Sequence, residues 1–323
     1  MRILVTGATS LVGISLVERL LQRGDEVTVF QRGPGDIEGA AERLGDISDP
    51  GAVGAAVTGA EAVVHLAARA GVTGRWELFE QANIVGTRCI IDAARAAGVA
   101  RFVHVSSPSV AHTGRSLVGA GSDPADPSGV RGHYARSKAH AELIALAADS
   151  PTMAVTAIRP HLIWGPGDTQ LVGRIIERAK AGRLAIVGSG AALIDTTYVD
   201  NAAEALVAAV DRAPMIAGRA LVVTNGQPRP VRELLSRIVL AAGLETPRLK
   251  VPYRVARTGG MAVEQIWERR DREDDPPLTS FLAEQLGTAH WFDQRETRLA
   301  LEWEPSVSLA EGFQRLRAHF ESS

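Results

Sequence analysis

A tyrosine and a lysine four residues apart, Tyr134 and Lys138, are the pair in this sequence best suited to chemistry. The chain has only three tyrosines and three lysines, so chance rarely produces this spacing. On a helix the two side chains share one face, and the ammonium lowers the phenol pKa from its ordinary value of about 10. Such a tyrosine can exchange a proton with a substrate oxygen. An incidental pair on a surface helix is the alternative.

Hydroxyl side chains follow a strand-like apolar run at residues 101–105. Ser106 and Ser107 come directly after it, and Pro108 follows them. In open α/β sheets the carboxyl ends of the strands face the crevice where ligands bind. Ser107 can therefore hydrogen-bond a substrate oxygen and orient it toward Tyr134. Without the tyrosine and the lysine, this serine-proline sequence indicates only a turn.

A glycine-containing turn connects the first apolar run to the first helical segment. Gly7 and Gly13 lie in that turn. Glycine lets the backbone approach a pyrophosphate, which then sits at the positive N-terminus of the helix. Ser10 stands between them, and its hydroxyl can donate a hydrogen bond to phosphate. Any tight strand-to-helix turn favours glycine, so the position after the first strand carries the prediction of a dinucleotide site.

The second apolar run ends in Gln31 and Arg32, and the next carboxylate along the chain is Asp36. Dinucleotide sites usually place an acid there to bind the adenosine ribose. An arginine at this point suits a 2′-phosphate, because its planar guanidinium makes paired, charge-assisted contacts. We therefore predict NADP(H) in preference to NAD(H), with Arg32 at the 2′-phosphate. A surface arginine without a ligand is the alternative.

Apolar runs rich in Val and Ile alternate with segments of helical period through the first half of the chain. The runs are residues 2–5, 26–30, 62–66, 101–105 and 154–158, and the helical segments are 11–22, 76–97 and 133–148. This alternation predicts an α/β fold with a doubly wound parallel sheet that is covered on both faces. Residues 220–224 are expected to add a late strand, residues 119–129 a loop, and residues 268–275 a solvated helix end before a turn.

The chain is expected to divide into two regions. Residues 1–165 plus 200–225 are predicted to form the NADP-binding domain. Residues 166–199 plus 226–323 are predicted to form a smaller, mostly helical substrate-binding region, because helical patterns dominate after the proline and glycine cluster near residue 166.

Composition excludes several classes of protein. The 323 residues are 46% hydrophobic and 22% charged with a net charge of −2, so no nucleic-acid footprint is indicated. Cys89 is the only cysteine and the eight histidines show no metal-ligand spacing, so neither a disulfide nor a metal is expected. No apolar stretch reaches the ~18 residues that a membrane span needs. We expect a soluble, cytoplasmic protein.

Taken together, the motifs resemble those of the extended short-chain dehydrogenase/reductases, which have a Rossmann-type sheet. They lie at residues 7–13, 45–47, 65–68, 83–87, 106–107, 134–138 and 159–160. Residues 159–168, 197–202 and 277–293 are similar to the 3β-hydroxysteroid dehydrogenase branch. The resemblance implies that Ser107, Tyr134 and Lys138 are catalytic, and that Ser107, Pro108, His161 and Trp164 contact the substrate. The cofactor residues that it implies, with those argued above, are Gly7, Thr9, Ser10, Leu11, Val12, Gly13, Arg32, Asp46, Ile47, Leu66, Ala67, Ala68, Asn83, Val105, Ser106, Tyr134, Lys138, Pro160, Leu162 and Ile163.

Within that branch, residues 106–110 and 159–168 look like the NADPH-dependent 2-alkyl-3-oxoalkanoate reductases of bacterial olefin biosynthesis. The resemblance implies reduction of a 2-alkyl-3-oxoalkanoic acid to the 2-alkyl-3-hydroxyalkanoic acid. A 3β-hydroxysteroid or sterol dehydrogenase and a non-catalytic NADP-binding sensor are the alternatives. Ala111 departs from the family, many members of which carry tyrosine there. The resemblance also implies a homodimer, built from the helices at residues 76–97 and 133–148, and other enzymes of the same pathway as partners.

Overall fold

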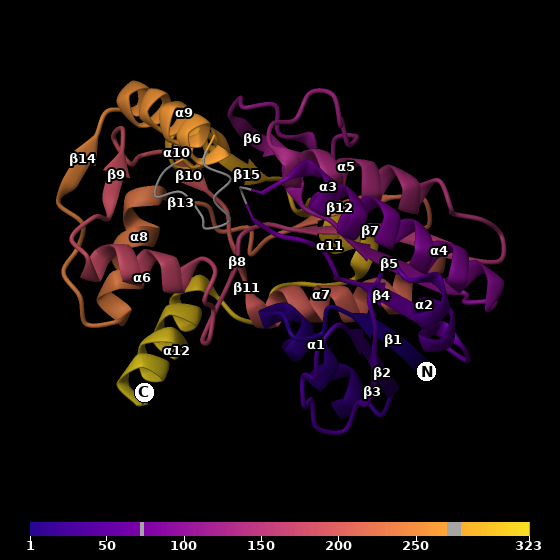
Figure 1. Cartoon of the computed structure of the whole chain (residues 1–323). Coiled ribbons are helices and arrows are strands. Elements are labelled where there is room, and N and C mark those ends of the chain that lie inside the picture. Colours follow the sequence, from indigo (N-terminus) through magenta and orange to yellow (C-terminus); the bar gives the residue numbers. More distant parts are fainter. Residues whose placement is uncertain (72–73, 270–278, 323) are drawn as a thin grey trace.

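The computed structural model describes residues 1–71, 74–269 and 279–322. Its main sheet has seven parallel strands in the order β12-β7-β5-β4-β1-β2-β3 (Figure 1). The strands are β1 (Arg2–Thr6), β2 (Glu26–Gln31), β3 (Ala41–Leu44), β4 (Ala62–His65), β5 (Arg101–Val105), β7 (Ala154–Pro160) and β12 (Ala220–Val223). The strand order reverses between β1 and β4, and a crevice for ligands is expected at the carboxyl ends of the strands at such a point.

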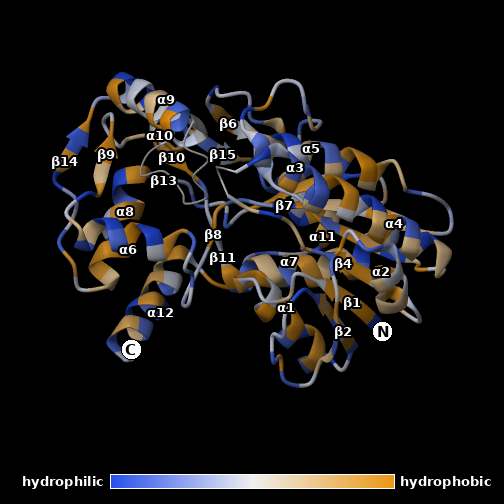
Figure 2. Ribbon diagram, in the orientation of Figure 1, coloured by the Kyte–Doolittle hydropathy of each residue, from blue (hydrophilic) through white to orange (hydrophobic). Residues whose placement is uncertain are grey.

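Helices cover both faces of the sheet, as predicted. One face carries α1 (Leu11–Gln22) and α7 (Val199–Arg212), and the other carries α2 (Pro50–Val57), α4 (Gly86–Ala96) and α5 (His133–Leu146). Two apolar cores result, one on each face, and Figure 2 shows hydrophobic residues along these strands. The strands read as nearly continuous apolar runs because both of their faces are buried. The late strand also joins this sheet, beside β7.

The segment predicted as one helix at residues 76–97 has three parts. These are α3 (Trp76–Phe79), a π-helical turn (Glu80–Val85) and α4. A π-helical turn places one extra residue in the turn, which rotates the side chains that follow and often marks a functional site. Here the turn holds Asn83, whose side chain is buried.

The C-terminal region has its own core, and β6 and β8 from before residue 166 join its short strands, which the sequence did not indicate. Its helices are α6 (Val172–Lys180), α8 (Val231–Ala241), α9 (Tyr253–Arg269), α10 (Ser280–Gly287) and α12 (Leu309–Ser322). Short strands form three small sheets, namely β6 (Leu117–Ala120), β10 (Leu193–Ile194), β13 (Arg229–Pro230) and β15 (His290–Phe292), then β8 (Ile163–Trp164) with β11 (Thr197–Tyr198), and β9 (Ala185–Val187) with β14 (Leu249–Val251). The prediction of a loop at residues 119–129 is therefore wrong for its first two residues, which end β6.

The remaining helix, α11 (Arg295–Leu301), packs beside α7 and β12 of the main domain. The predicted turn at residues 276–277, and most of the charged run before it, lie outside the described residues. Among the described residues, no helix combines the length and apolar character required to cross a bilayer.

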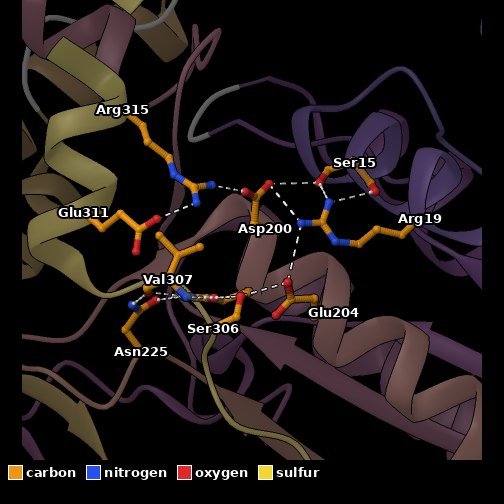
Figure 3. Close-up of polar contacts among 10 residues, drawn as sticks. Ser15, Arg19, Asp200, Glu204, Asn225, Ser306, Val307, Glu311 and Arg315 are labelled. Atoms are coloured by element: carbon orange, nitrogen blue, oxygen red, sulfur yellow. Dashed lines mark hydrogen bonds and ion pairs between the residues drawn. The ribbon is translucent and has the colours of Figure 1, made fainter. Parts of the chain in front are cut away.

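A polar network fastens α1 to the C-terminal helix α12 through α7 (Figure 3). Asp200, at the start of α7, pairs with Arg19 of α1 at 3.2 Å and with Arg315 of α12 at 2.8 Å. Ser15 of α1 donates a weaker hydrogen bond of 3.4 Å to the same carboxylate. Asp200 thus links α1, the helix that begins at the glycine turn, to α12 of the second region.

Candidate active site

The glycine turn after β1 is shaped by close backbone contact. Gly7 has a φ of +71°, and a Cβ there would lie 2.7 Å from the backbone nitrogen of Ala67. A Cβ at Gly13 would lie 2.7 Å from the carbonyl oxygen of Ala8. Both positions therefore require glycine, and the carboxyl end of β4 comes against the turn. This arrangement fits a dinucleotide, because the backbone of the turn stays open at the helix N-terminus.

Ser10 acts as the N-cap of α1. Its Oγ accepts a hydrogen bond from the Gly13 amide at 3.2 Å and donates one to the Gly7 carbonyl at 3.0 Å. A serine is favoured at an N-cap for this reason. The Ser10 hydroxyl, which was expected to donate a hydrogen bond to phosphate, is thus engaged within the turn.

The end of β2 has a carboxylate that the sequence order concealed. Glu42, on the edge strand β3, accepts hydrogen bonds of 2.8 Å from the side-chain amide of Gln31 and from the Gly35 backbone. The sequence places no acid between β2 and Asp36, but β3 pairs in parallel with β2 and brings its own acid to that point. The Gln31 Oε1 is buried without a partner, and the Arg32 side chain beyond it is exposed.

Two predicted cofactor residues, Asp46 and Ile47, follow β3, and Asp46 lies near Arg32. Asp46 accepts hydrogen bonds from the backbone and hydroxyl of Ser48, which hold its pKa below the ordinary value. The positive charge of Arg32 lowers the same pKa further. Ile47 packs on α4, where a Cβ at Gly86 would lie 2.6 Å from its side chain.

The structure brings Ser107 and Tyr134 together. Ser107 begins a 3-10 turn (Pro108–Ala111), and its Oγ accepts hydrogen bonds from the backbone and hydroxyl of Ser109 at 3.3 and 3.0 Å. The hydroxyl of Ser107 also lies close enough to the Tyr134 phenol to lower its pKa. Burial raises the pKa of Tyr134 above its ordinary value, and the nearby Ser107 hydroxyl opposes the rise. The phenol therefore carries its proton at neutral pH.

Lys138 is a buried residue of α5, four positions after Tyr134. Its Nζ donates a hydrogen bond of 2.6 Å to the Val105 carbonyl at the end of β5. Burial lowers the pKa of Lys138 to about 8, and the nearby Glu142 carboxylate opposes that shift. The expected lowering of the Tyr134 pKa by this ammonium is not found: burial of the phenol raises that pKa, and the group that opposes the rise is Ser107. With a pKa of about 8, the Lys138 side chain is mostly charged at neutral pH.

A chain of hydrogen bonds connects Asn83 to α5, the helix that carries Tyr134 and Lys138. The Asn83 Oδ1 accepts from the Arg69 backbone amide at 2.6 Å, and its Nδ2 donates to the Arg69 carbonyl at 3.1 Å. The same Nδ2 donates to the Ser137 Oγ at 2.8 Å, and that hydroxyl donates to the Tyr134 carbonyl at 2.9 Å. Asn83, predicted as a cofactor residue, thus positions both the segment after β4 and the first turn of α5.

Two predicted substrate residues lie among other protein groups. His161 is bonded to His290 of β15 at 2.7 Å. The Nε2 of His290 donates to the Gln285 carbonyl, so its Nδ1 accepts from His161. Trp164 belongs to the core of the second region, where it stacks on Phe313 with a ring separation of 4.5 Å. His161 therefore joins the two regions, and Trp164 packs rather than lining open space.

The other predicted residues follow the carboxyl ends of the central strands. Pro108 is buried in its turn, and the Ser106 Oγ is buried without a hydrogen-bond partner. The remaining cofactor residues lie in the turn after β1, after β4, at the end of β5, and at or after the end of β7: Thr9, Leu11, Val12, Leu66, Ala68, Val105, Pro160, Leu162 and Ile163. The unpartnered oxygens of Gln31 and Ser106 are the polar atoms that a dinucleotide could satisfy here.

Comparison with known proteins places these residues in context. The model of the NAD dependent epimerase/dehydratase family matches residues 3–223. The chain is 42% identical to the 2-alkyl-3-oxoalkanoate reductase of Stenotrophomonas maltophilia, over 98% of this chain and 99% of that protein. It is 30% identical to the human sterol-4-alpha-carboxylate 3-dehydrogenase, decarboxylating, over 97% and 87%. Its fold is similar to the crystal structure of gox2253, with a TM-score of 0.80 and 25% identity over 99% and 98% of the two chains.

Proposed function

Because this chain belongs to the NAD dependent epimerase/dehydratase family, we propose that it is an NADP(H)-dependent reductase of a hydrophobic 3-oxo acid. The substrate that we propose is a 2-alkyl-3-oxoalkanoic acid, and the product is the 2-alkyl-3-hydroxyalkanoic acid. The observation that supports this most is the proximity of Ser107 to the buried Tyr134 phenol, with Lys138 on the same helix, in a chain 42% identical to a reductase of that substrate class. A sensor without turnover would need no proton donor at this point.

The chain's own residues supply the acid and the orientation for this reaction. When bound, the nicotinamide dinucleotide provides the hydride. Ser107 hydrogen-bonds the ketone oxygen and holds it beside the Tyr134 phenol. Tyr134, protonated at neutral pH, gives its proton to that oxygen as negative charge develops there. The Lys138 ammonium stabilises the phenolate that remains.

The choice between NADPH and NADH is proposed to depend on Arg32. Arg32→Ala should weaken NADPH binding by roughly 1–3 kcal/mol, because a charge-assisted contact with the 2′-phosphate is lost. NADH lacks that phosphate, so its affinity should change little. Equilibrium titration of both cofactors checks this. Equal losses for the two, or a native preference for NADH, would show that the Glu42 carboxylate rather than Arg32 governs the ribose end.

The dependence of kcat/KM on the length of the substrate's alkyl chain should distinguish an alkanoate reductase from a sterol dehydrogenase. Each additional methylene buried by the protein contributes about 0.8 kcal/mol, which is about fourfold in kcat/KM. A series of 2-alkyl-3-oxo acids should therefore show rising kcat/KM until the added methylenes are no longer buried by the protein. A 3-ketosteroid at matched concentration is the comparison. A flat series with brisk turnover of the steroid would favour the sterol dehydrogenase instead, the class of the human relative.

We also propose that the chain forms an isologous homodimer through residues 76–97, which include α3 and α4, and residues 133–148, which include α5. Leu78 of α3 and Leu143 of α5 are 42% and 43% exposed, so this side of the main domain still offers apolar surface. Light scattering at micromolar concentration should give twice the mass of the chain. A monomer mass would refute the dimer. Association with other enzymes of the same pathway and a cytoplasmic location stay predictions.

A further inference from the structure

Arg69 places a guanidinium close to the catalytic helix, and the sequence motifs did not single it out. It follows β4 by four residues, just beyond Ala67, which abuts the glycine turn. Its side chain is partly buried, and its Nε is buried without a hydrogen-bond partner. Within the part of the chain that the structure describes, no carboxylate pairs with it.

The position of Arg69 is fixed on two sides. Asn83 binds its backbone amide and its carbonyl, as described above. Its guanidinium lies over the buried Phe79 ring, 5.4 Å from the centroid. The same ring lies 6.0 Å from the ring of His133, which directly precedes Tyr134. One short set of contacts therefore holds this cation beside the start of the catalytic helix.

A guanidinium with a buried, unsatisfied N–H group is costly unless an anion meets it. Desolvating a charged donor without a partner is unfavourable, and the planar fork of arginine matches the two oxygens of a carboxylate. Phe79 covers one side of the guanidinium by a cation–π contact but offers no acceptor to the Nε proton. An oxyanion ligand would satisfy that proton.

We propose that Arg69 binds an oxyanion in the crevice, and that this oxyanion is the carboxylate of the substrate. The inference rests on the proposed function, in which the substrate is a 3-oxo acid. A carboxylate held at Arg69 fixes one end of the reacting unit while Ser107 holds the ketone oxygen. Arg69 thereby favours the acid over its ester and over a simple ketone. The pyrophosphate of the dinucleotide is the competing source of the same chemistry.

The test uses the stable hydroxy acid and NADP⁺, so that the oxidation direction is followed. Arg69→Gln removes the charge and keeps a polar side chain, and Arg69→Lys keeps the charge without the fork. Arg75→Gln is the matched control, since Arg75 lies on the same segment, is 71% exposed and pairs with Glu77 at 3.4 Å. The substrates are a 2-alkyl-3-hydroxyalkanoic acid and its methyl ester. Thermal unfolding confirms that each variant is folded.

Arg69→Gln should lower kcat/KM for the acid by about 10- to 100-fold, the usual range for a lost charge-assisted hydrogen bond. The ester should be turned over as in the wild type, and the Kd for NADPH should not change. Arg69→Lys should recover part of the loss, and Arg75→Gln should behave as the wild type does. Calorimetric titration of the hydroxy acid into the NADP⁺ complex reads the same contact without turnover.

Other results would overturn the assignment in distinguishable ways. Equal losses for acid and ester mean that Arg69 only supports the fold of its segment. A weakened Kd for NADPH means that the oxyanion belongs to the cofactor. If the wild type turns over neither substrate yet binds the acid, and Arg69→Gln loses that binding, the proposed reaction fails while the carboxylate site stands. If the acid binds equally to both proteins, the site itself is refuted.

Discussion

Tyr134→Phe should reduce kcat by about 10²- to 10⁴-fold, the usual contribution of a positioned general acid. The substitution keeps the ring and removes the only group that we assign to proton donation. The fall should appear in kcat rather than in cofactor affinity, because Lys138 is held by the Val105 carbonyl independently of the phenol. Steady-state oxidation of NADPH by the 3-oxo acid, together with equilibrium titration of NADPH, separates the two quantities.

The matched control is Tyr253→Phe, which removes a phenol hydroxyl of the same kind from a different helix, α9. It should leave kcat as in the wild type. If Tyr134→Phe retained more than about a tenth of the wild-type kcat, another group or a water would have to supply the proton, and the role of Tyr134 would be wrong.

The second large effect concerns the attachment of the catalytic helix to the sheet. Arg159 of β7 and Glu142 of α5 are both almost fully buried, and two hydrogen bonds of 2.8 and 2.5 Å join them. A third bond, of 2.7 Å, runs from Arg159 to the Asp123 carbonyl. Arg159→Met leaves the Glu142 carboxylate buried and unpaired. The free energy of unfolding should fall by about 3–5 kcal/mol, as is typical when one partner of a buried pair is removed.

Urea denaturation measures this loss, and two further variants bound its interpretation. Arg219→Met breaks an ion pair with Glu296 in which both side chains are well exposed, so it should cost no more than about 1 kcal/mol. Arg159→Met combined with Glu142→Leu removes both buried charges and should recover much of the lost stability. A single Arg159→Met variant as stable as the wild type would show that Glu142 is solvated or neutral in the folded protein.

The sequence predicted those features that depend on local pattern. Long apolar runs predicted six of the seven sheet strands, and helix spacing predicted α1 with its observed bounds. Motif order also predicted that Ser107 and Tyr134 meet. These features are readable because each strand of a covered parallel sheet is apolar on both faces, and because the carboxyl ends of such strands converge.

Features that depend on contacts between distant segments were not readable. The edge strand β3 consists of Ala41, Glu42, Arg43 and Leu44, which has no apolar run, because only one neighbour and little core require it. The sequence therefore did not predict that Glu42 lies at the end of β2. The hydrogen bonds that place Arg69 against Asn83 follow from a π-helical turn, which has no sequence signature.

The direction of the Tyr134 pKa shift could not be predicted from the sequence either. The spacing of Tyr134 and Lys138 predicted a lowered phenol pKa, yet burial raises it. A helical repeat gives the shared face of two side chains but not the depth to which the surrounding elements bury them. Desolvation is set by that depth.

Transfer of an isotopic label tests most directly whether the protein moves hydride from NADPH to C3 of a 3-oxo acid. NADPH carrying deuterium at the transferable C4 position is mixed with the protein and a 2-alkyl-3-oxoalkanoic acid, and the product is analysed by mass spectrometry. We expect a 2-alkyl-3-hydroxyalkanoic acid with one deuterium on C3, and little of it with Tyr134→Phe. Recovery of unlabelled hydroxy acid, or of unreacted keto acid while the protein binds NADPH, would contradict this expectation.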